Sequence, residues 1–325
     1  MTMFKRHFLT TCALLALGAI TPIAQAQEFP SKPVRILVPF PAGGAVDIIA
    51  RLMSTDMATS LGTSVLVENR PGASGNIAFD AVAKAPGDGY TLIMASASLA
   101  INKSLIKATP FDPRKDFTPI ALIAMVPSVL VVTKDLPVNS VQELIAYGKA
   151  NPGKLNYGSN GAGTTQHLAA TMFALRNGVG ITHVPYKGVD QLLPDLASGR
   201  IQMSFNNVAS MQSQLKAGNI RALAVGREQR WAGMPQLPTY AEAGIGGLEY
   251  ASWVGLLGPA NLPPAVADKL GKAVTVALAN AQTRERIEAG GNELKASSAA
   301  AFGSFFNQEI DNWAKAIAAA GLQPE

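Results

Sequence analysis

VRILVPFPAGGAVD, residues 34–47, joins two patterns that mark a strand and a helix. The first five residues are mostly apolar, rich in β-branched side chains and bounded by prolines, which predicts a strand. From Ile48 onward the apolar side chains recur at helical spacing, through Leu52 and on to Leu61. The stretch therefore predicts a strand, a glycine-containing turn and the start of a helix.

The turn at residues 39–47 has two interpretations. Gly43 and Gly44 let a ligand approach the backbone, and the first N–H groups of a helix have no partner inside the helix. Such a turn suits an anion, for example a carboxylate. The alternative is an ordinary strand-to-helix connection in which Asp47 is the N-terminal cap of the helix.

The same order of elements recurs along the chain. Apolar segments at residues 64–67 and 90–94 alternate with helical patterns, and residues 155–157, 181–186, 201–205 and 220–225 repeat this order. Alternating strands and helices predict βαβ units and parallel pairing. Ligands of such sheets bind beyond the carboxyl ends of the strands. This rule favours ligand binding at residues 39–47 and at the small-residue loop 95–98.

Three segments complete the predicted order of elements. The longest apolar run, residues 120–132, is predicted to be extended and buried, with Pro127 inside it. Ser140, with Glu143 three residues later, predicts a capped helix start. A long helix is expected from Pro264 to Ala289, followed by a last helix with an aromatic core face.

The N-terminus predicts an exported protein. Lys5 and Arg6 precede a short apolar stretch at residues 9–20, and Ala24-Gln25-Ala26 is a cleavage signal, so residues 1–26 are expected to be a signal peptide. The alternative is a membrane anchor. Cleavage also removes Cys12, the only cysteine. The mature chain would fold without disulfides or cysteine metal ligands.

Composition excludes some function classes. The chain has 325 residues, of which 48% are hydrophobic and 15% are charged, as in a globular protein of up to two domains. Without Lys5 and Arg6, 25 basic residues face 22 acidic ones, a net charge of +3. A small excess without basic runs argues against nucleic acid as a partner.

A second glycine-rich turn, residues 158–165, resembles the first. Gly158 and Gly163 have the spacing of a phosphate loop, but Thr164 stands where the lysine would be, which argues against a nucleotide. The turn offers backbone N–H groups and hydroxyls, and the alternative is a plain glycine turn. His167 either lines the site or only caps hydrogen bonds, and His183 is predicted to be core. Metal-ligand clusters and a G-x-S-x-G nucleophile motif are not found.

Six motifs, in order along the mature chain, resemble the Bug family, the TctC-like receptors of tripartite tricarboxylate transporters. They are PVRILVPFPAGG (33–44), ENRPGASGN (68–76), PGDGYTL (86–92), YGSNGAGTTQH (157–167), VPYKG (184–188) and AGNIRALAV (217–225). The resemblance implies an α/β fold of two lobes, the Venus flytrap of periplasmic binding proteins, with a mixed sheet flanked by helices in each lobe. It places domain 1 at residues 27–124 and 254–325 and domain 2 at residues 125–253, with chain crossings near residues 123–132 and 250–257.

The resemblance also implies a ligand cleft between the lobes. The first loop would hold a ligand carboxylate, partly through water, and the second loop would face it. Two positions depart from the family pattern: Asn206 stands where aspartate is frequent, and the loop at Ser96 and Ser98 is poorer in threonine, glycine and histidine. The expected ligand-binding residues are Phe40, Pro41, Ala42, Gly43, Gly44, Asp47, Ser96, Ser98, Ser159, Asn160, Gly163, Thr164, Thr165, His167 and Asn206.

The expected function is capture of a small organic carboxylate in the periplasm for membrane transporter subunits. The protein would be a monomer, without catalysis, cofactor, metal or nucleic-acid partner. One alternative is an exported hydrolase that uses Ser74 or Ser159, which the lack of a paired base disfavours. Another is a sensor that presents its closed form to a signalling partner.

Overall fold

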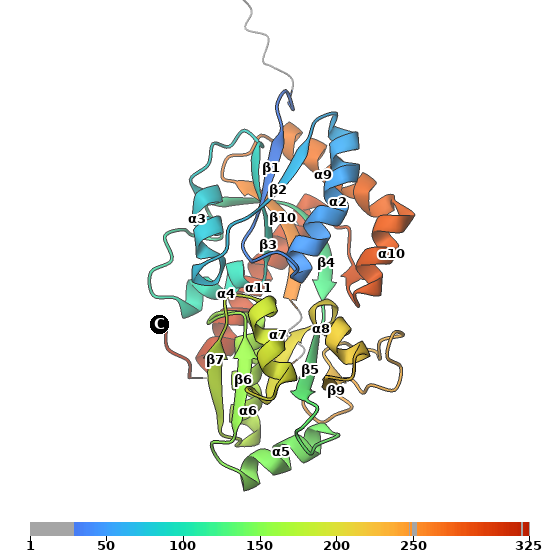
Figure 1. Cartoon of the computed structure of the whole chain (residues 1–325). Helices are drawn as coiled ribbons and strands as arrows, with labels where there is room; N and C mark the ends of the chain where they lie inside the picture. The colour runs from blue at the N-terminus through green and yellow to red at the C-terminus, as the bar shows by residue number, and fades with distance from the viewer. Residues whose placement is uncertain (1–28, 247, 249–251, 320, 325) are drawn as a thin grey trace, which may run out of the picture. The chain divides into compact units, whose positions relative to one another are not determined.

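The computed structural model describes residues 29–246, 248, 252–319 and 321–324. The predicted signal peptide, residues 1–26, lies outside this range. Within Lys32–Glu325 the described strands form two separate sheets (Figure 1). We call each sheet with its helices a lobe.

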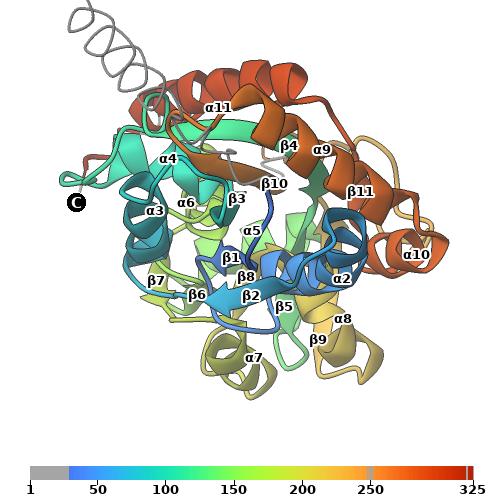
Figure 2. The same cartoon turned by 90° about the horizontal axis from the view of Figure 1, so that it is seen from above.

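The first lobe is built on a six-stranded sheet, and helices cover both of its faces. In spatial order its strands are β11 (Glu293–Leu294), β4 (Phe117–Val126), β10 (Ser252–Pro259), β3 (Thr91–Ser96), β1 (Val34–Val38) and β2 (Val65–Asn69). Its helices are α2 (Ala45–Leu61), the 3-10 turn η1 (Ala73–Gly75), α3 (Asn76–Ala83), α4 (Ser98–Leu105), α9 (Pro264–Ala279), α10 (Ala281–Ala289) and α11 (Ala299–Ala319). Figure 2 shows α2, α9 and α10 next to one another, while α3 and α4 lie apart from them.

The second lobe is built on a five-stranded sheet. In spatial order its strands are β7 (Ile181–Pro185), β6 (Leu155–Ser159), β8 (Met203–Asn207), β5 (Ser128–Thr133) and β9 (Ile220–Val225). Its helices are α5 (Val141–Ala150), α6 (Thr165–Asn177), α7 (Val189–Ala197) and α8 (Val208–Lys216). Alternate residues of β5 face opposite cores, since Leu130 packs with α5 and α6 while Val131 packs with α7 and α8.

Both sheets are mixed, which confirms the expected fold and corrects the purely parallel pairing that the βαβ order predicts. β1 is parallel to β2 and β3, and β6 is parallel to β7 and β8. β10 is antiparallel to β3 and β4, and β5 is antiparallel to β8 and β9. β5 and β10 each follow a change of sheet, where the chain enters without a crossover helix, and the short β11, which follows α10, is also antiparallel to β4.

The chain changes sheet at Pro127. The predicted apolar run is extended and buried, but it forms two strands, β4 in the first lobe and β5 in the second. Proline cannot donate a ladder hydrogen bond, so it suits the single residue between the two sheets. The chain is back in the first sheet at Ser252, where β10 begins by pairing with Val126.

Two helix predictions have different outcomes. Ser140 caps α5 by accepting the Glu143 N–H at 3.1 Å, as predicted. The long helix predicted from Pro264 to Ala289 is wrong, because the structure has two helices that meet at Asn280. The Asn280 side chain accepts the N–H groups of Gln282 and Thr283 and so begins α10 as its N-cap.

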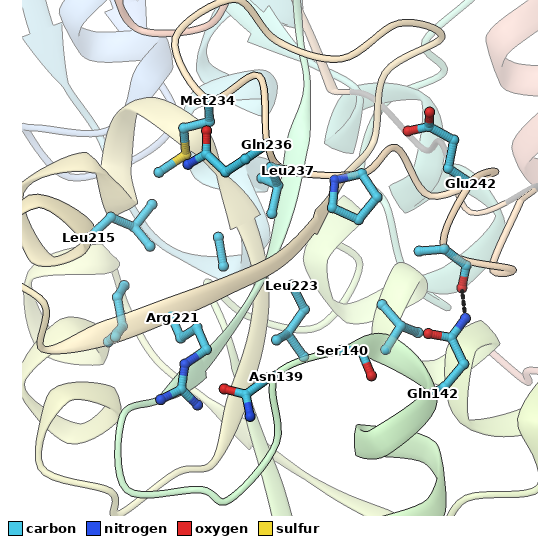
Figure 3. Close-up of a pocket in the computed structure, with 15 residues that line it drawn as sticks. Asn139, Ser140, Gln142, Leu215, Arg221, Leu223, Met234, Gln236, Leu237 and Glu242 are labelled. Atoms are coloured by element: carbon cyan, nitrogen blue, oxygen red, sulfur yellow. Dashed lines mark hydrogen bonds between the residues drawn. The ribbon is translucent and has the colours of Figure 1, made fainter.

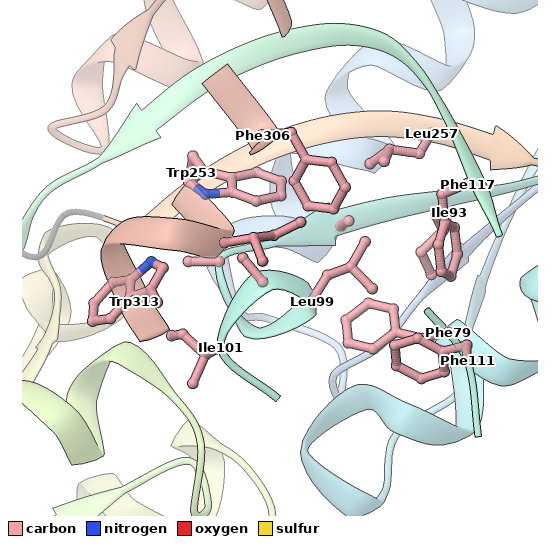
Figure 4. Close-up of a cluster of buried hydrophobic side chains, with 14 of the residues drawn as sticks. Phe79, Ile93, Leu99, Ile101, Phe111, Phe117, Trp253, Leu257, Phe306 and Trp313 are labelled. Carbon is pink, nitrogen blue, oxygen red and sulfur yellow. The ribbon is translucent and has the colours of Figure 1, made fainter. Parts of the chain in front are cut away.

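An aromatic cluster anchors the last helix to the first lobe (Figure 4). Trp253 of β10 contacts Phe302 and Phe306 of α11 edge to face, with ring centroids 5.6 and 5.7 Å apart. The indole N–H groups of Trp253 and Trp313 both donate to Glu309 Oε2, at 3.0 and 3.1 Å. Both buried indole N–H groups therefore have a hydrogen-bond acceptor, and α11 packs its aromatic face into the core, as predicted.

Candidate functional site

The first glycine loop is held in place by Asp47, which is 3% exposed. Asp47 Oδ2 accepts the Gly43 N–H at 3.0 Å, and Oδ1 accepts from Arg51 Nε at 2.9 Å and from Asn69 Nδ2 at 2.8 Å. The same Asn69 amide donates to the Phe40 carbonyl at 3.0 Å. Asp47 is the third residue of α2 and not its N-cap, which is Gly44. Its carboxylate therefore fixes the loop.

Burial raises the pKa of Asp47, but hydrogen bonds from Arg51, Gly43 and Asn69 lower it by more, so the pKa lies below its ordinary value. The ion pair with Arg51 also offsets the negative charge close to the loop. The Asp47–Arg51 pair is therefore nearly neutral overall, and it repels an anion near the loop only weakly.

The low pKa of Asp47 predicts a pH dependence of stability. A carboxyl whose pKa is lower when folded stabilises the protein above its unfolded pKa, about 3.9, and this stabilisation is lost as the pH falls through the folded pKa. We expect the unfolding free energies of wild type and Asp47→Asn, measured by urea denaturation, to differ at pH 7 and to converge in acid. A constant difference from pH 7 to pH 3 would contradict this role.

Two stacked histidines, His167 and His183, hydrogen-bond the second glycine loop. The Thr164 hydroxyl caps α6 by accepting the His167 N–H at 3.4 Å, and His167 Nδ1 accepts the Gly163 N–H at 3.4 Å. Burial lowers the pKa of His167, which keeps its ring neutral and able to accept. The rings of His167 and His183 stack with centroids 4.4 Å apart. Of the two roles considered for His167, the structure gives it that of a hydrogen-bonding support.

Ser159 has a histidine partner, contrary to the expectation that no base is paired with it. Ser159 Oγ lies 2.7 Å from His183 Nε2, and His183 is half-buried at β7 and not a core residue. Ser159 is 0% exposed, however, and its hydroxyl also bonds the Gly161 backbone. A substrate carbonyl cannot reach this oxygen, so the pair shapes the loop and does not form a nucleophilic site.

A small inner cavity of about 40 Å³ lies where the two glycine loops face each other. Its lining comes from both lobes: Phe40, Gly44, Ala45, Val46, Ser96, Ser98, Ser252, Asn160, Thr165, Gln166, Asn207 and Ser210. These residues include the first turns of four helices, α2, α4, α6 and α8. Of these, α2, α4 and α8 have no side-chain cap, so no side chain competes with a ligand for the first N–H groups of these helices.

The inner cavity favours an anion without using a cation. Among the described residues that line it, none carries an ionisable side chain. Four helix N-termini bring partial positive charge to one place, and the serine, threonine and amide side chains supply neutral donors. One side-chain atom assigned as Asn160 Oδ1 is buried without a partner among the described residues. A flip of the amide would place a donor there.

A larger outer cavity of about 660 Å³ shares Phe40 and Asn160 with the inner one. Its other lining residues are Pro39, Pro41, Pro71, Gly72, Ala73, Ser74, Gly75, Gly161, Tyr186, Lys187, Asp190 and Gln191. The two cavities together can hold a molecule whose charged end is small and whose body is larger.

The lobes contact each other on both sides of the inner cavity. On one side the Ser74 hydroxyl donates to the Ala162 carbonyl, and Gly163 lies so close to Asn102 that a Cβ would be 2.7 Å from its Oδ1. On the other side Arg227 Nη2 pairs with Glu293 Oε1 at 2.9 Å. These contacts hold the two glycine loops against each other, so a ligand in the cavity would touch both lobes.

The family model of the tripartite tricarboxylate transporter family receptor, TctC, matches residues 49–322. The chain belongs to the TctC family. Protein BugT of Bordetella pertussis is 33% identical over 311 residues, which are 95% of each chain. The predicted Bug-type, TctC-like relationship is confirmed.

Solved TctC-like structures have the same fold. R. palustris Rpa4515 with adipate has a TM-score of 0.88 and 38% identity, covering 92% of this chain and all of that one. The periplasmic binding protein BugD has a TM-score of 0.87 and 33% identity, covering 91% and 100%. MatC from Rhodopseudomonas palustris with bound malate has a TM-score of 0.83 and 29% identity, covering 89% and 100%. The two-lobed periplasmic-binding-protein fold is thus confirmed.

The structure brings together part of the site predicted from the TctC resemblance. Seven predicted residues line a cavity: Phe40, Pro41, Gly44, Ser96, Ser98, Asn160 and Thr165. Eight line neither: Ala42, Gly43, Asp47, Ser159, Gly163, Thr164, His167 and Asn206. Asp47, Ser159, Thr164 and His167 bond the loops internally. Asn206 is fully buried in β8 opposite Val129 and accepts the Asn207 N–H at 2.8 Å.

Sequence reasoning missed six residues of the inner cavity: Ala45, Val46, Gln166, Asn207, Ser210 and Ser252. Two signals could have found four of them. Ala45, Val46 and Gln166 occupy the first turns of predicted helices, and Asn207 lies between a predicted strand and a helix, where asparagine is typical of an N-cap. Ser210 and Ser252 carry no local signal, because only the folding of distant segments brings them to the cavity.

A further cavity of about 430 Å³ lies within the second lobe (Figure 3). Its charged groups have partners: Arg221 Nη1 donates to the carbonyl of Val138 at 2.6 Å, and Glu242 pairs with Arg230 at 2.9 Å. The amide of Gln142 donates to the Ala243 carbonyl across its mouth. We do not assign the ligand to this cavity.

Two features are absent from the part of the chain that the structure describes. No group of three or more His, Cys, Asp or Glu side chains there could hold a metal ion. None of the helices described is both long and apolar enough to span a bilayer.

Proposed function

We propose that this TctC-family chain captures a small carboxylate between its lobes and delivers it to membrane transporter subunits. The supporting observation is the convergence of four helix N-termini, three without a side-chain cap, on a small cavity lined by neutral residues. Rpa4515 holds adipate and MatC holds malate, and both molecules are carboxylates.

The donors at the cavity are sufficient in number. A hydrogen bond to a charged group contributes about 1.5–3 kcal/mol, and micromolar binding requires about 8 kcal/mol. Between three and six such bonds from backbone N–H groups, Ser98, Thr165 and Asn160 would reach this value. A buried arginine is not needed, because the helix termini are already oriented before the ligand arrives.

The lobes would close on the ligand as domain 1, residues 27–124 and 254–325, and domain 2, residues 125–253. The change of sheet at Pro127 and the return by Ser252 support these boundaries. Closure would shift an existing equilibrium between open and closed forms. In the proposal the protein is exported by cleavage of residues 1–26, works in the periplasm as a monomer and performs no catalysis.

Titration of the purified mature chain, residues 27–325, with adipate and malate tests the proposal. We expect calorimetry to give a micromolar dissociation constant for at least one acid, with a higher melting temperature when that acid is present in excess. Adipamide is the matched control, because it keeps the chain length and removes the charge. Failure of every mono-, di- and tricarboxylate tried, or equal binding of adipamide, would contradict the proposal.

A further inference from the structure

The outer cavity is lined by an unusual number of ring side chains. Five of its lining residues carry a ring: Pro39, Phe40, Pro41, Pro71 and Tyr186. They come from the first glycine loop, the loop after β2 and the end of β7, so the rings belong to both lobes. The prolines add apolar surface, and the flat aromatic rings of Phe40 and Tyr186 favour a ligand body that is itself apolar and flat.

A side-chain hydrogen bond holds the Tyr186 ring, and a hydrogen bond to the backbone holds the loop that carries Phe40. The Tyr186 hydroxyl donates to Asp195 Oδ2 at 2.8 Å, and burial together with this bond raises the pKa of Tyr186 to about 12. The Phe40 carbonyl accepts from Asn69, which Asp47 also holds. Since the Tyr186 hydroxyl is already paired, the ring is the part of this residue that remains for a ligand. Holding these groups in place reduces the ordering cost of binding.

The charges of the outer cavity do not select a second anionic group. Among its described lining residues, Lys187 is the one cation and Asp190 is the one anion, and both are exposed. A second carboxylate would have to leave water for a lining that is mostly ring and backbone, with a single cation offset by Asp190. The inner cavity, at about 40 Å³, holds a carboxylate head but not the body of a diacid.

We propose that the outer cavity is a subsite for an aromatic ring, so that the preferred ligands are aryl carboxylates. The carboxylate occupies the inner cavity and the ring lies between Phe40 and Tyr186 in the outer one. This inference rests on the proposed function and narrows its ligand class.

Competition between benzoate and matched acids tests the subsite. Calorimetry on the mature chain should give at least tenfold tighter binding for benzoate than for hexanoate or adipate. Tyr186→Ala should weaken benzoate about tenfold and change hexanoate less than threefold. Tyr186→Phe keeps the ring while removing the bond to Asp195, so it should retain at least a third of the benzoate affinity. Phe40→Leu keeps an apolar side chain but removes the ring, so it should weaken benzoate binding more than hexanoate binding. This variant replaces Tyr186→Ala as the test if Tyr186→Ala does not fold.

The outcomes separate the subsite from the proposed function. If adipate binds as tightly as benzoate and Lys187→Gln abolishes that binding, the outer cavity recognises a second carboxylate and the ring subsite is wrong. Equal losses of hexanoate and benzoate in Tyr186→Ala would also overturn it. If neither benzoate nor any aliphatic acid binds, the carboxylate receptor itself is contradicted.

Discussion

Gly44→Val is expected to weaken binding of the carboxylate ligand at least 100-fold while leaving the fold intact. Gly44 has φ −78° and ψ 164°, which a valine adopts readily, and the atom nearest to an added Cβ is the Pro41 carbonyl oxygen at 3.9 Å. The space around that Cβ belongs to the inner cavity, which holds only about 40 Å³. The three added carbon atoms would occupy the place of the carboxylate head, and a 100-fold loss corresponds to about 2.8 kcal/mol.

Gly180→Val is the matched control for this substitution. Nothing lies within 4 Å of a Cβ built on Gly180, which precedes β7 and lines neither cavity. It should bind as wild type does. Calorimetry gives the affinities, and circular dichroism with urea denaturation checks the fold, where Gly44→Val should lose at most about 1 kcal/mol because valine is a poor N-cap. Wild-type affinity in a folded Gly44→Val protein would exclude the inner cavity as the carboxylate site.

Asp47→Ala is expected to lower the free energy of unfolding by about 2–4 kcal/mol at pH 7. The substitution removes the acceptor of three hydrogen bonds, so the Gly43 N–H loses its side-chain partner. Asn69 Nδ2 keeps only the Phe40 carbonyl, and Arg51 keeps only Asn69 Oδ1. Arg51 can turn to water, since its side chain is half exposed, but the buried end of the Asn69 amide cannot do so as easily. The first loop should loosen, and ligand affinity should fall about tenfold because donors that are not fixed bind less well.

Glu288→Ala provides the comparison for Asp47→Ala. Glu288 also pairs with an arginine four residues away on a helix, Arg284, but both side chains are about half exposed. Such a surface pair contributes less than about 0.5 kcal/mol. Urea denaturation of both variants at pH 7 separates the two cases. A loss of less than 1 kcal/mol in Asp47→Ala, or an equal loss in Glu288→Ala, would show that Asp47 does not hold the loop.

Neutral donors explain how the proposed carboxylate site can exist beside a buried aspartate. The negative charge of Asp47 is offset by Arg51 and by three hydrogen bonds, so it repels a second carboxylate only weakly. Helix termini supply the remaining positive potential without the desolvation penalty that a buried lysine or arginine would incur. The same arrangement leaves ligand choice to the outer cavity, where the side chains differ most in chemistry.

Local sequence was sufficient for the elements that flank the site. The strand at residues 34–38, its glycine turn and the helix after it are predicted by β-branched content, Gly43 and apolar spacing, because each signal acts within a few residues. The Ser140 cap is equally local. The prediction of one long helix was wrong at Asn280 because the apolar spacing continues through the break. The only signal for a new helix there is the Asn280 side chain that caps it.

By itself the sequence determined that two glycine turns would follow strands and precede helices, and it assigned the family through motifs spread over the mature chain. The tertiary structure decided which residues of those turns line a cavity. Ser96, Ser210 and Ser252 belong to different elements and meet at one cavity only when both lobes are folded and in contact. The family resemblance implied that Asp47 and Ser159 contact the ligand, yet their polar atoms are used to fix the loops. Hydrogen-bond partners far apart in sequence exist only in the folded state, so local pattern cannot reveal which polar group remains free for a ligand.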